Sequence, residues 1–177
     1  MNILITGAQG FVGKNLTAAL RSIAEGKDRT HPALSVGELY LYDLDTDPAL
    51  LDGYCQKADF VFHLAGVNRP KDPAEFMAGN FGFSSTLLET LKKHGNTCPV
   101  VLSSSIQATL IGRYDSDYGR SKKAGEELMF YEEKLGLAKR FQLAEAQTAE
   151  LLSLMEKEGV GGKIREAAKE LLETVGG

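Results

Sequence analysis

The sequence has no tryptophan and only two cysteines, Cys55 and Cys98, among its 177 residues. The cysteines lie far apart in the sequence, and neither belongs to a Cys-x-x-Cys pair or a Cys/His cluster. Neither a disulfide framework nor a zinc site is therefore supported. We expect two ordinary reduced thiols and no metal.

The sequence also lacks an excess of basic residues and any long apolar run. Its formal net charge of −4 argues against nucleic acid as the main partner. No apolar run approaches the ~18 residues of a membrane span, and the first predicted strand begins at residue 2, which leaves no room for a signal peptide. These absences predict a soluble cytoplasmic protein with no membrane partner. Its length fits one domain, with or without an appendage.

The first thirteen residues combine a short buried strand, a glycine turn and the start of a helix. The run Ile3-Leu4-Ile5 is typical of a central parallel strand that is buried on both faces. Glycines then recur at every third position, so the backbone can turn tightly, approach a pyrophosphate and let the helix pack on the strand. The helix N-terminus favours an anion at this point. We therefore predict that a dinucleotide phosphate is bound by Gly7, Gly10, Phe11, Val12 and Gly13.

A tight strand-to-helix turn without a ligand is the alternative interpretation of these glycines. Nucleotide binding is favoured because the glycines follow a strand and open an amphipathic helix. The apolar face of that helix comprises Val12, Leu16, Leu20 and Ile23.

Asp43 follows the second predicted strand, residues 38–42. An acidic residue at this place can accept hydrogen bonds from the adenosine ribose hydroxyls and would repel a 2′-phosphate, which favours NAD over NADP. The alternative is a solvated loop carboxylate, because Asp45 and Asp47 follow closely.

The third predicted strand, residues 59–66, follows a short helix over residues 48–57. The small residues at its end allow backbone to line the adenosine half of a cofactor. The residues predicted to flank that half are Leu64, Ala65 and Gly66. His63 is interpreted as a structural histidine inside an apolar strand and is given no chemical role.

The spacing of apolar residues predicts a helix over residues 72–94, and Asn80 lies on its apolar stripe. A buried amide is costly unless it is hydrogen-bonded, so Asn80 must hold another segment in place. A local tie between helix and strand is one possibility.

A serine cluster and a tyrosine-lysine pair complete the predicted site. The strand over residues 99–102 runs into Ser103, Ser104 and Ser105, at the strand edge where open α/β sheets bind ligands, although serines are also common in turns and helix caps. Tyr118 and Lys122 share one helix face, and a nearby ammonium favours the phenolate, which makes the tyrosine a usable general acid or base. The tyrosine-lysine spacing alone is common, but it is a strong indication in this chain order.

Four stretches resemble the extended branch of the short-chain dehydrogenase/reductase superfamily, the NAD-dependent epimerase/dehydratase family. They are residues 5–16, 58–70, 103–109 and 118–122. The similarity is closest to the reductase part of capsular-polysaccharide enzymes that act on UDP-linked 4-keto-6-deoxy-N-acetylhexosamines. The Val-Asn-Arg-Pro run within 58–70 and the Ser-Ile-Gln-Ala-Thr run within 103–109 are more discriminating than the general superfamily motifs. Coverage extends from residue 1 to about residue 136.

The resemblance implies an NAD(P)-dependent oxidoreductase that reduces a ketone of a nucleotide-linked deoxy sugar in capsule or surface polysaccharide biosynthesis. It implies that Tyr118 donates the proton, that Ser105 hydrogen-bonds the carbonyl oxygen, and that Lys122 holds the nicotinamide ribose. It also places Asn80 against the backbone beside the active-site serine and near the cofactor, with Ser103 among the cofactor-binding residues. Such reductases are associated with NADPH, against the Asp43 argument, so the cofactor is NAD or NADP. Related helices often form a homodimer bundle, here through Ala124, Leu128, Tyr131 and Leu135.

The predicted fold is α/β: a Rossmann-like, doubly wound sheet of about four parallel strands with a helical C-terminal appendage. Residues 1–136 form the predicted NAD(P)-binding domain, and residues 137–177 form the appendage, where a family member would continue with a further strand and a substrate-binding region. A dinucleotide-binding module with little or no catalysis, serving as a sensor, a scaffold or a truncated fragment, is therefore the alternative function.

Overall fold

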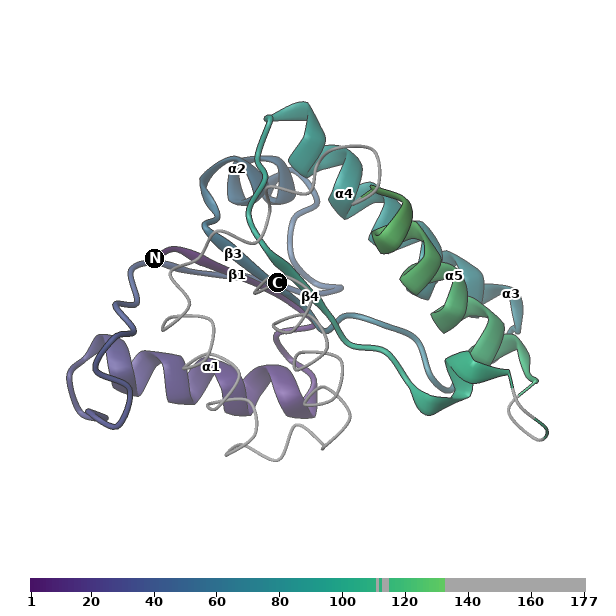
Figure 1. Ribbon diagram of the computed structural model, residues 1–177, viewed down its shortest axis with the longest axis horizontal. Helices are drawn as coiled ribbons and strands as arrows, with labels where there is room; N and C mark the ends of the chain where they lie inside the picture. Colours follow the sequence, from purple (N-terminus) through teal and green to yellow (C-terminus); the bar gives the residue numbers. More distant parts are fainter. Residues whose placement is uncertain (111, 113–114, 133–177) are drawn as a thin grey trace, which may run out of the picture.

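The computed structural model describes residues 1–110, 112 and 115–132. Its four strands form one parallel sheet, in which neighbours follow the order β2-β1-β3-β4 (Figure 1). The strands are β1 (Ile3–Thr6), β2 (Leu39–Tyr42), β3 (Phe60–His63) and β4 (Val100–Leu102). Because β1 lies between β2 and β3, the chain winds outward from it in both directions, which confirms the doubly wound parallel sheet.

Helices cover both faces of this sheet. In Figure 1, α1 lies along one face, whereas α2 and α4 lie on the other and α5 runs beside α4. The helical elements are α1 (Phe11–Ala24), α2 (Leu50–Lys57), α3 (Ala74–Met77), the π-turn η1 (Ala78–Gly82), α4 (Phe83–Lys93), the 3₁₀ turn η2 (Ile106–Thr109) and α5 (Asp117–Glu132).

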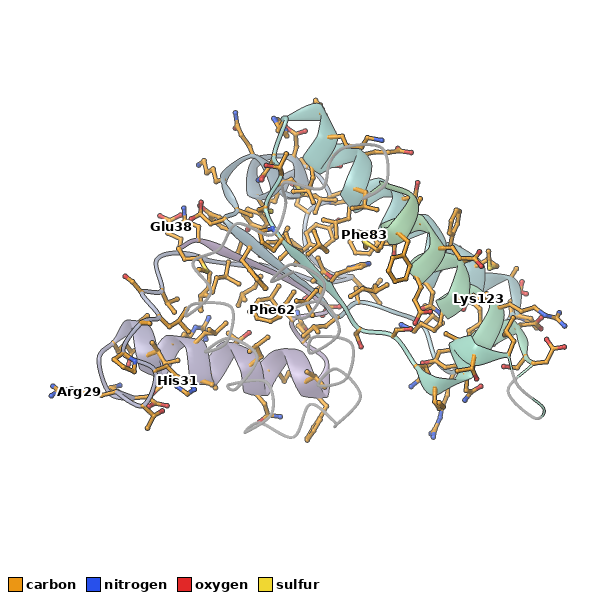
Figure 2. All side chains as sticks on the ribbon, viewed as in Figure 1. Arg29, His31, Glu38, Phe62, Phe83 and Lys123 are labelled. Atoms are coloured by element: carbon orange, nitrogen blue, oxygen red, sulfur yellow. The ribbon has the colours of Figure 1, made fainter. Side chains whose placement is uncertain are left out.

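The core has two layers because successive strand residues point to opposite sides of the sheet. Ile3, Ile5 and Phe62 pack with the apolar stripe of α1, whereas Leu4 and Val61 pack with α2 and α4. Figure 2 shows the labelled Phe62 side chain between the sheet and α1. Because the central strands are buried on both faces, their sequences are runs of apolar residues and do not alternate with polar ones.

The predicted helix over residues 72–94 is interrupted, which the periodicity did not anticipate. The π-turn Ala78–Gly82 separates α3 from α4. Within it, the carbonyl of Asn80 accepts a hydrogen bond of 2.6 Å from the Ser84 hydroxyl. A side-chain hydroxyl that bonds the carbonyl four residues earlier competes with the regular helix ladder, and π-turns are frequent at functional sites.

Several predictions lie outside the described residues. The appendage over 137–177 and Leu135 of the predicted dimer stripe belong to this group, so the domain division stays a prediction. Among residues 1–110, 112 and 115–132, no helix has the length and apolar character needed to cross a membrane.

Candidate functional site

The glycine turn after β1 is packed against its neighbours without room for side chains. Gly7 has a φ of +71°, which favours glycine, and a Cβ there would lie 2.6 Å from the backbone nitrogen of Ala65. A Cβ on Gly13 would lie 2.2 Å from the carbonyl oxygen of Gly7. The turn, the start of α1 and the segment after β3 therefore approach one another through their backbones.

The N-terminus of α1 is open to an anion. Gly10 precedes the helix, no side chain caps it, and its first turn holds no acidic residue. The first-turn N–H groups of a helix have no partner within the helix, and the helix dipole favours negative charge beside them. Phe11 begins this helix and is 81% exposed, so the predicted phosphate-binding residues border an accessible surface. These features fit the pyrophosphate of a dinucleotide.

Asp43 lies beside this turn and is hydrogen-bonded to it. Its carboxylate accepts a hydrogen bond of 2.7 Å from the backbone N–H of Gln9, and another from the backbone N–H of Leu44. The side-chain amide of Gln9 donates to both carboxylate oxygens of Asp45, each at 2.7 Å. Asp43 is thus fixed beside the glycine turn, where its carboxylate can accept hydrogen bonds from ribose hydroxyls. Gln9 is a residue that the sequence reasoning missed.

The segment after β3 connects the cradle to the rest of the site. The backbone N–H of Leu64 donates to the carbonyl of Thr6 at 3.1 Å. A Cβ on Gly66 would meet the side-chain oxygen of Asn80 at 2.7 Å and the Nζ atom of Lys122 at 2.9 Å. Gly66 is therefore the point where the β3 segment, the π-turn and α5 meet.

Asn80 is buried and joins three segments. Its side-chain oxygen accepts from the N–H of Val67 at 2.9 Å, and its Nδ2 donates to the carbonyl of Val67 at 2.8 Å and to Ser121 Oγ at 2.9 Å. Ser121 in turn donates to the carbonyl of Tyr118 at 2.8 Å. The resemblance implies that Asn80 supports the backbone beside Ser105. In the structure, these bonds go instead to the β3 segment and to α5.

Lys122 is buried at the junction. Its side chain is only 7% exposed, and its Nζ donates to the carbonyl of Ser103 at 3.0 Å. Burial lowers the pKa of Lys122, and the carboxylate of Glu126 on the same helix opposes that shift. An ammonium has three donors, so Lys122 can hold Ser103 and still bind a ligand hydroxyl.

Tyr118 stands next to this ammonium. Lys122 Nζ lies 6.0 Å from the centroid of the Tyr118 ring, and Phe76 of α3 contacts the same ring at 5.6 Å between centroids. The structure therefore brings together the predicted tyrosine and lysine.

The serine cluster has divided roles. Ser104 Oγ donates to the Glu126 carboxylate, which ties the end of β4 to α5. Ser105 is the residue before η2, and its Oγ accepts from the backbone N–H of Gln107 at 3.3 Å. Gln107 also accepts a bond of 3.1 Å from the hydroxyl of Ser116, so the turn that starts at Ser105 is docked at the start of α5.

The structure thus gathers most of the predicted residues at the carboxyl ends of β1, β3 and β4. A hydrogen bond joins Ser103 to Lys122, and the Lys122 ammonium faces the Tyr118 ring, whereas Ser105 is linked to the start of α5 through Gln107 and Ser116. The sequence reasoning missed Ser121 and Glu126, although both share the Tyr118–Lys122 helix at spacings of three and four residues, which would have indicated a common face.

The arrangement can bind a dinucleotide along one edge and move a proton at its far end. Glycine backbone and an uncapped helix N-terminus can receive phosphates, and the Asp43 carboxylate can accept from ribose hydroxyls. At the Lys122 side of the site, a buried ammonium stands beside a phenol. Such a phenol can give a proton to a carbonyl oxygen or remove one from an alcohol.

Most of the described chain is similar to known proteins. A model of the NAD dependent epimerase/dehydratase family matches residues 3–138. A UDP-2-acetamido-2,6-beta-L-arabino-hexul-4-ose reductase from Pseudomonas aeruginosa is 43% identical over 129 residues, which cover 72% of this chain and 30% of the reductase.

Solved structures give the same picture. The capsular polysaccharide assembling protein CapF from Staphylococcus aureus is 40% identical with a TM-score of 0.57, and the match covers 77% of this chain and 33% of CapF. A short-chain dehydrogenase/reductase superfamily protein from Agrobacterium tumefaciens with bound NAD is 23% identical with a TM-score of 0.61, over 76% of this chain and 45% of that protein, and shows the fold alone. The chain spans about a third of the length of the reductase and of CapF.

Proposed function

The chain belongs to the NAD dependent epimerase/dehydratase family, and from this premise we propose that it binds NAD along the carboxyl edge of the sheet. The observation that carries the proposal is the uncapped N-terminus of α1 beside Asp43, because it offers a phosphate site and a ribose acceptor together. Leu64, Ala65 and Gly66 flank the adenosine half, and Tyr118 and Lys122 lie at the nicotinamide ribose.

NAD is proposed over NADP on electrostatic grounds. The carboxylates of Asp43 and Asp45 both accept hydrogen bonds from Gln9 in the glycine turn. Two negative groups at this place would repel a 2′-phosphate, whereas ribose hydroxyls can donate to them.

The proposed reaction is reduction of a ketone on a nucleotide-linked deoxy sugar. The nicotinamide cofactor, when bound, supplies the hydride. Tyr118 donates its phenolic proton to the carbonyl oxygen, and Lys122 stabilises the phenolate that remains. Ser105 hydrogen-bonds the same oxygen, since its own oxygen serves as an acceptor for Gln107 and its hydrogen can be donated to a ligand.

The substrate class rests on the relatives. The Pseudomonas aeruginosa relative is named as a reductase of a UDP-linked hexulose, and CapF is named as a capsular polysaccharide assembling protein. We therefore place the proposed activity in capsule or surface polysaccharide biosynthesis.

Cofactor titration tests the binding half of the proposal. NADH and NADPH are titrated into the full chain, and wild-type protein is expected to prefer NADH. Asp43→Ala should shift this preference towards NADPH by about tenfold, the effect of about 1.4 kcal/mol. Glu89→Gln removes one exposed carboxylate from α4 and should leave the preference unchanged. An unchanged ratio in Asp43→Ala would remove Asp43 from the ribose site.

A second candidate function is a dinucleotide-binding module with little or no catalysis. The observation that favours it is that the contacts described above, from the glycine turn to Lys122, concern the dinucleotide half of the proposed site. Holding two reactants in fixed geometry can lower a reaction barrier by ~7–11 kcal/mol. Contacts to the sugar beyond the dinucleotide half of the site would contribute to that positioning.

A turnover assay separates the two functions. NADH oxidation is followed with a UDP-linked 4-keto-6-deoxy sugar. Oxidation that depends on the sugar supports the reductase, whereas NADH binding without oxidation supports the module. The division at residue 136, the homodimer, the absence of a nucleic-acid partner and the cytoplasmic location stay predictions.

A further inference from the structure

His63 at the end of β3 is completely buried and hydrogen-bonded at both ring nitrogens. Its Nδ1 lies 2.7 Å from Thr6 Oγ1 at the end of β1, and its Nε2 lies 2.8 Å from Ser84 Oγ on α4. The ring therefore bridges the strand that leads into the glycine turn and the helix that follows the π-turn.

The neighbouring bonds fix the position of the ring proton. Ser84 has one hydroxyl hydrogen, and it is donated to the carbonyl of Asn80 at 2.6 Å. Ser84 Oγ must therefore accept a hydrogen from Nε2 of His63. Nδ1 is then an acceptor for the Thr6 hydroxyl, whose oxygen accepts a longer bond of 3.4 Å from the N–H of Ala65.

We propose that His63, neutral and protonated at Nε2, is a positioning residue that couples the cradle side of the cofactor site to the side that holds Tyr118. One arm runs through Thr6 to the backbone of Ala65, beside Gly7. The other arm runs through Ser84 to Asn80.

The second arm reaches the proposed catalytic helix in two further steps. Asn80, whose carbonyl holds Ser84, binds both backbone groups of Val67 and donates to Ser121. Ser121 donates to the carbonyl of Tyr118. Loss of the Ser84 bond should therefore loosen Val67 and the start of α5, whereas loss of the Thr6 bond should loosen Ala65.

The electrostatic surroundings keep the ring neutral. Burial, together with the Lys122 ammonium, lowers the pKa of His63 to about 3. Phe83 packs against the ring at 5.5 Å between centroids and offers no counter-charge. A second ring proton would also face the Thr6 hydroxyl and leave that hydrogen without its acceptor.

Nitrogen NMR of the imidazoles in the apo chain tests the protonation state directly. The chain has three histidines, and the His63 signals are identified by their loss in His63→Asn. We expect a neutral ring with the hydrogen on Nε2 from pH 5 to pH 8. A charged ring in this range, or the hydrogen on Nδ1, would overturn the proposal.

Two substitutions separate the arms because asparagine places a polar atom near Nδ1 and glutamine places one near Nε2. His63→Asn keeps an acceptor for Thr6 and loses the Ser84 bond, so the Val67 amide should exchange its hydrogen about tenfold faster, with Ala65 unchanged. His63→Gln should show the reverse pattern. Equal changes at both amides in both variants would indicate general loosening and reject separate arms. Ser84→Ala and Thr6→Val repeat the test without changing the ring, if the His63 variants do not fold.

Ligand binding provides a second test, because loss of a merely structural residue should weaken the binding of ADP and NADH alike in both variants. This test rests on the proposed cofactor site. ADP probes the cradle side, whereas NADH probes both sides. His63→Asn should weaken the binding of NADH about three- to tenfold, the effect of about one net hydrogen bond, and should leave the affinity for ADP unchanged. His63→Gln should weaken ADP and NADH equally. Failure of wild-type protein to bind either ligand would reject the cofactor site, and the NMR and exchange results would then decide the His63 proposal.

Discussion

Replacing Asn80 by alanine should destabilise the protein and loosen the site at the same time. The substitution removes three hydrogen bonds of 2.8–2.9 Å, two to the backbone of Val67 and one to Ser121. At about 0.5–1.5 kcal/mol of net stability for each bond, the sum is roughly 1.5–4.5 kcal/mol. Val67 is partly exposed, so water can replace part of the hydrogen bonding that its backbone loses. We therefore expect the free energy of unfolding to fall by about 2–3 kcal/mol.

Urea unfolding measures this loss as a lower midpoint with an unchanged slope, which indicates altered stability of one two-state transition. Asn15→Ala is the matched control, because Asn15 Nδ2 makes one exposed bond to the carbonyl of Phe11 within α1. Alanine also has the higher helix propensity, so the control should change stability by less than about 0.5 kcal/mol. An Asn80→Ala variant that is as stable as this control, with unchanged NADH affinity, would refute the role given to Asn80.

Three further predictions concern the site. Tyr118→Phe should abolish ketone reduction yet keep NADH binding, and turnover that persists would reject Tyr118 as the proton donor. Gly13→Ala should lower NADH affinity more than about tenfold, because its Cβ would lie 2.2 Å from a backbone oxygen, whereas Gly53→Ala in α2 meets nothing within 4 Å and should keep affinity. The free energy of unfolding should fall by up to about 1.4 kcal/mol per pH unit between about pH 6.5 and pH 3, because the unfolded chain then protonates the His63 ring, which stays neutral in the folded protein until about pH 3. A urea midpoint with the same pH slope in His63→Asn would contradict this.

The sheet and the glycine cradle could be predicted from the sequence because their determinants are local. An apolar run followed by regularly spaced glycines specifies strand, turn and helix within thirteen residues, and alternation of strands with helices implies parallel pairing. The order of neighbours, β2-β1-β3-β4, was not predicted, because right-handed crossovers fix the face on which each helix lies but not which strands pair.

The connections within the site could not be predicted, because their partners are distant in sequence. The buried position of Asn80 predicted that its amide must be satisfied, yet its partners lie 13 and 41 residues away. The π-turn lies where Asn80 makes these contacts and where its carbonyl accepts from Ser84, and helical periodicity alone did not indicate it. His63 was interpreted as structural, and only the structure shows that it joins β1 to α4.

The position of these contacts bears on the choice between reductase and module. Thr6, Asn80 and Lys122 are held by partners within residues 1–132, so these contacts of the proposed dinucleotide site form within that part of the chain. Preorganised donors cost no reorganisation when a ligand arrives, and NADH affinity should therefore depend mainly on residues 1–132. The rate of reduction depends in addition on holding the sugar ketone in place. The contacts of Thr6, Asn80 and Lys122 lie in the proposed cofactor half of the site, so turnover, unlike cofactor binding, depends on contacts beyond them.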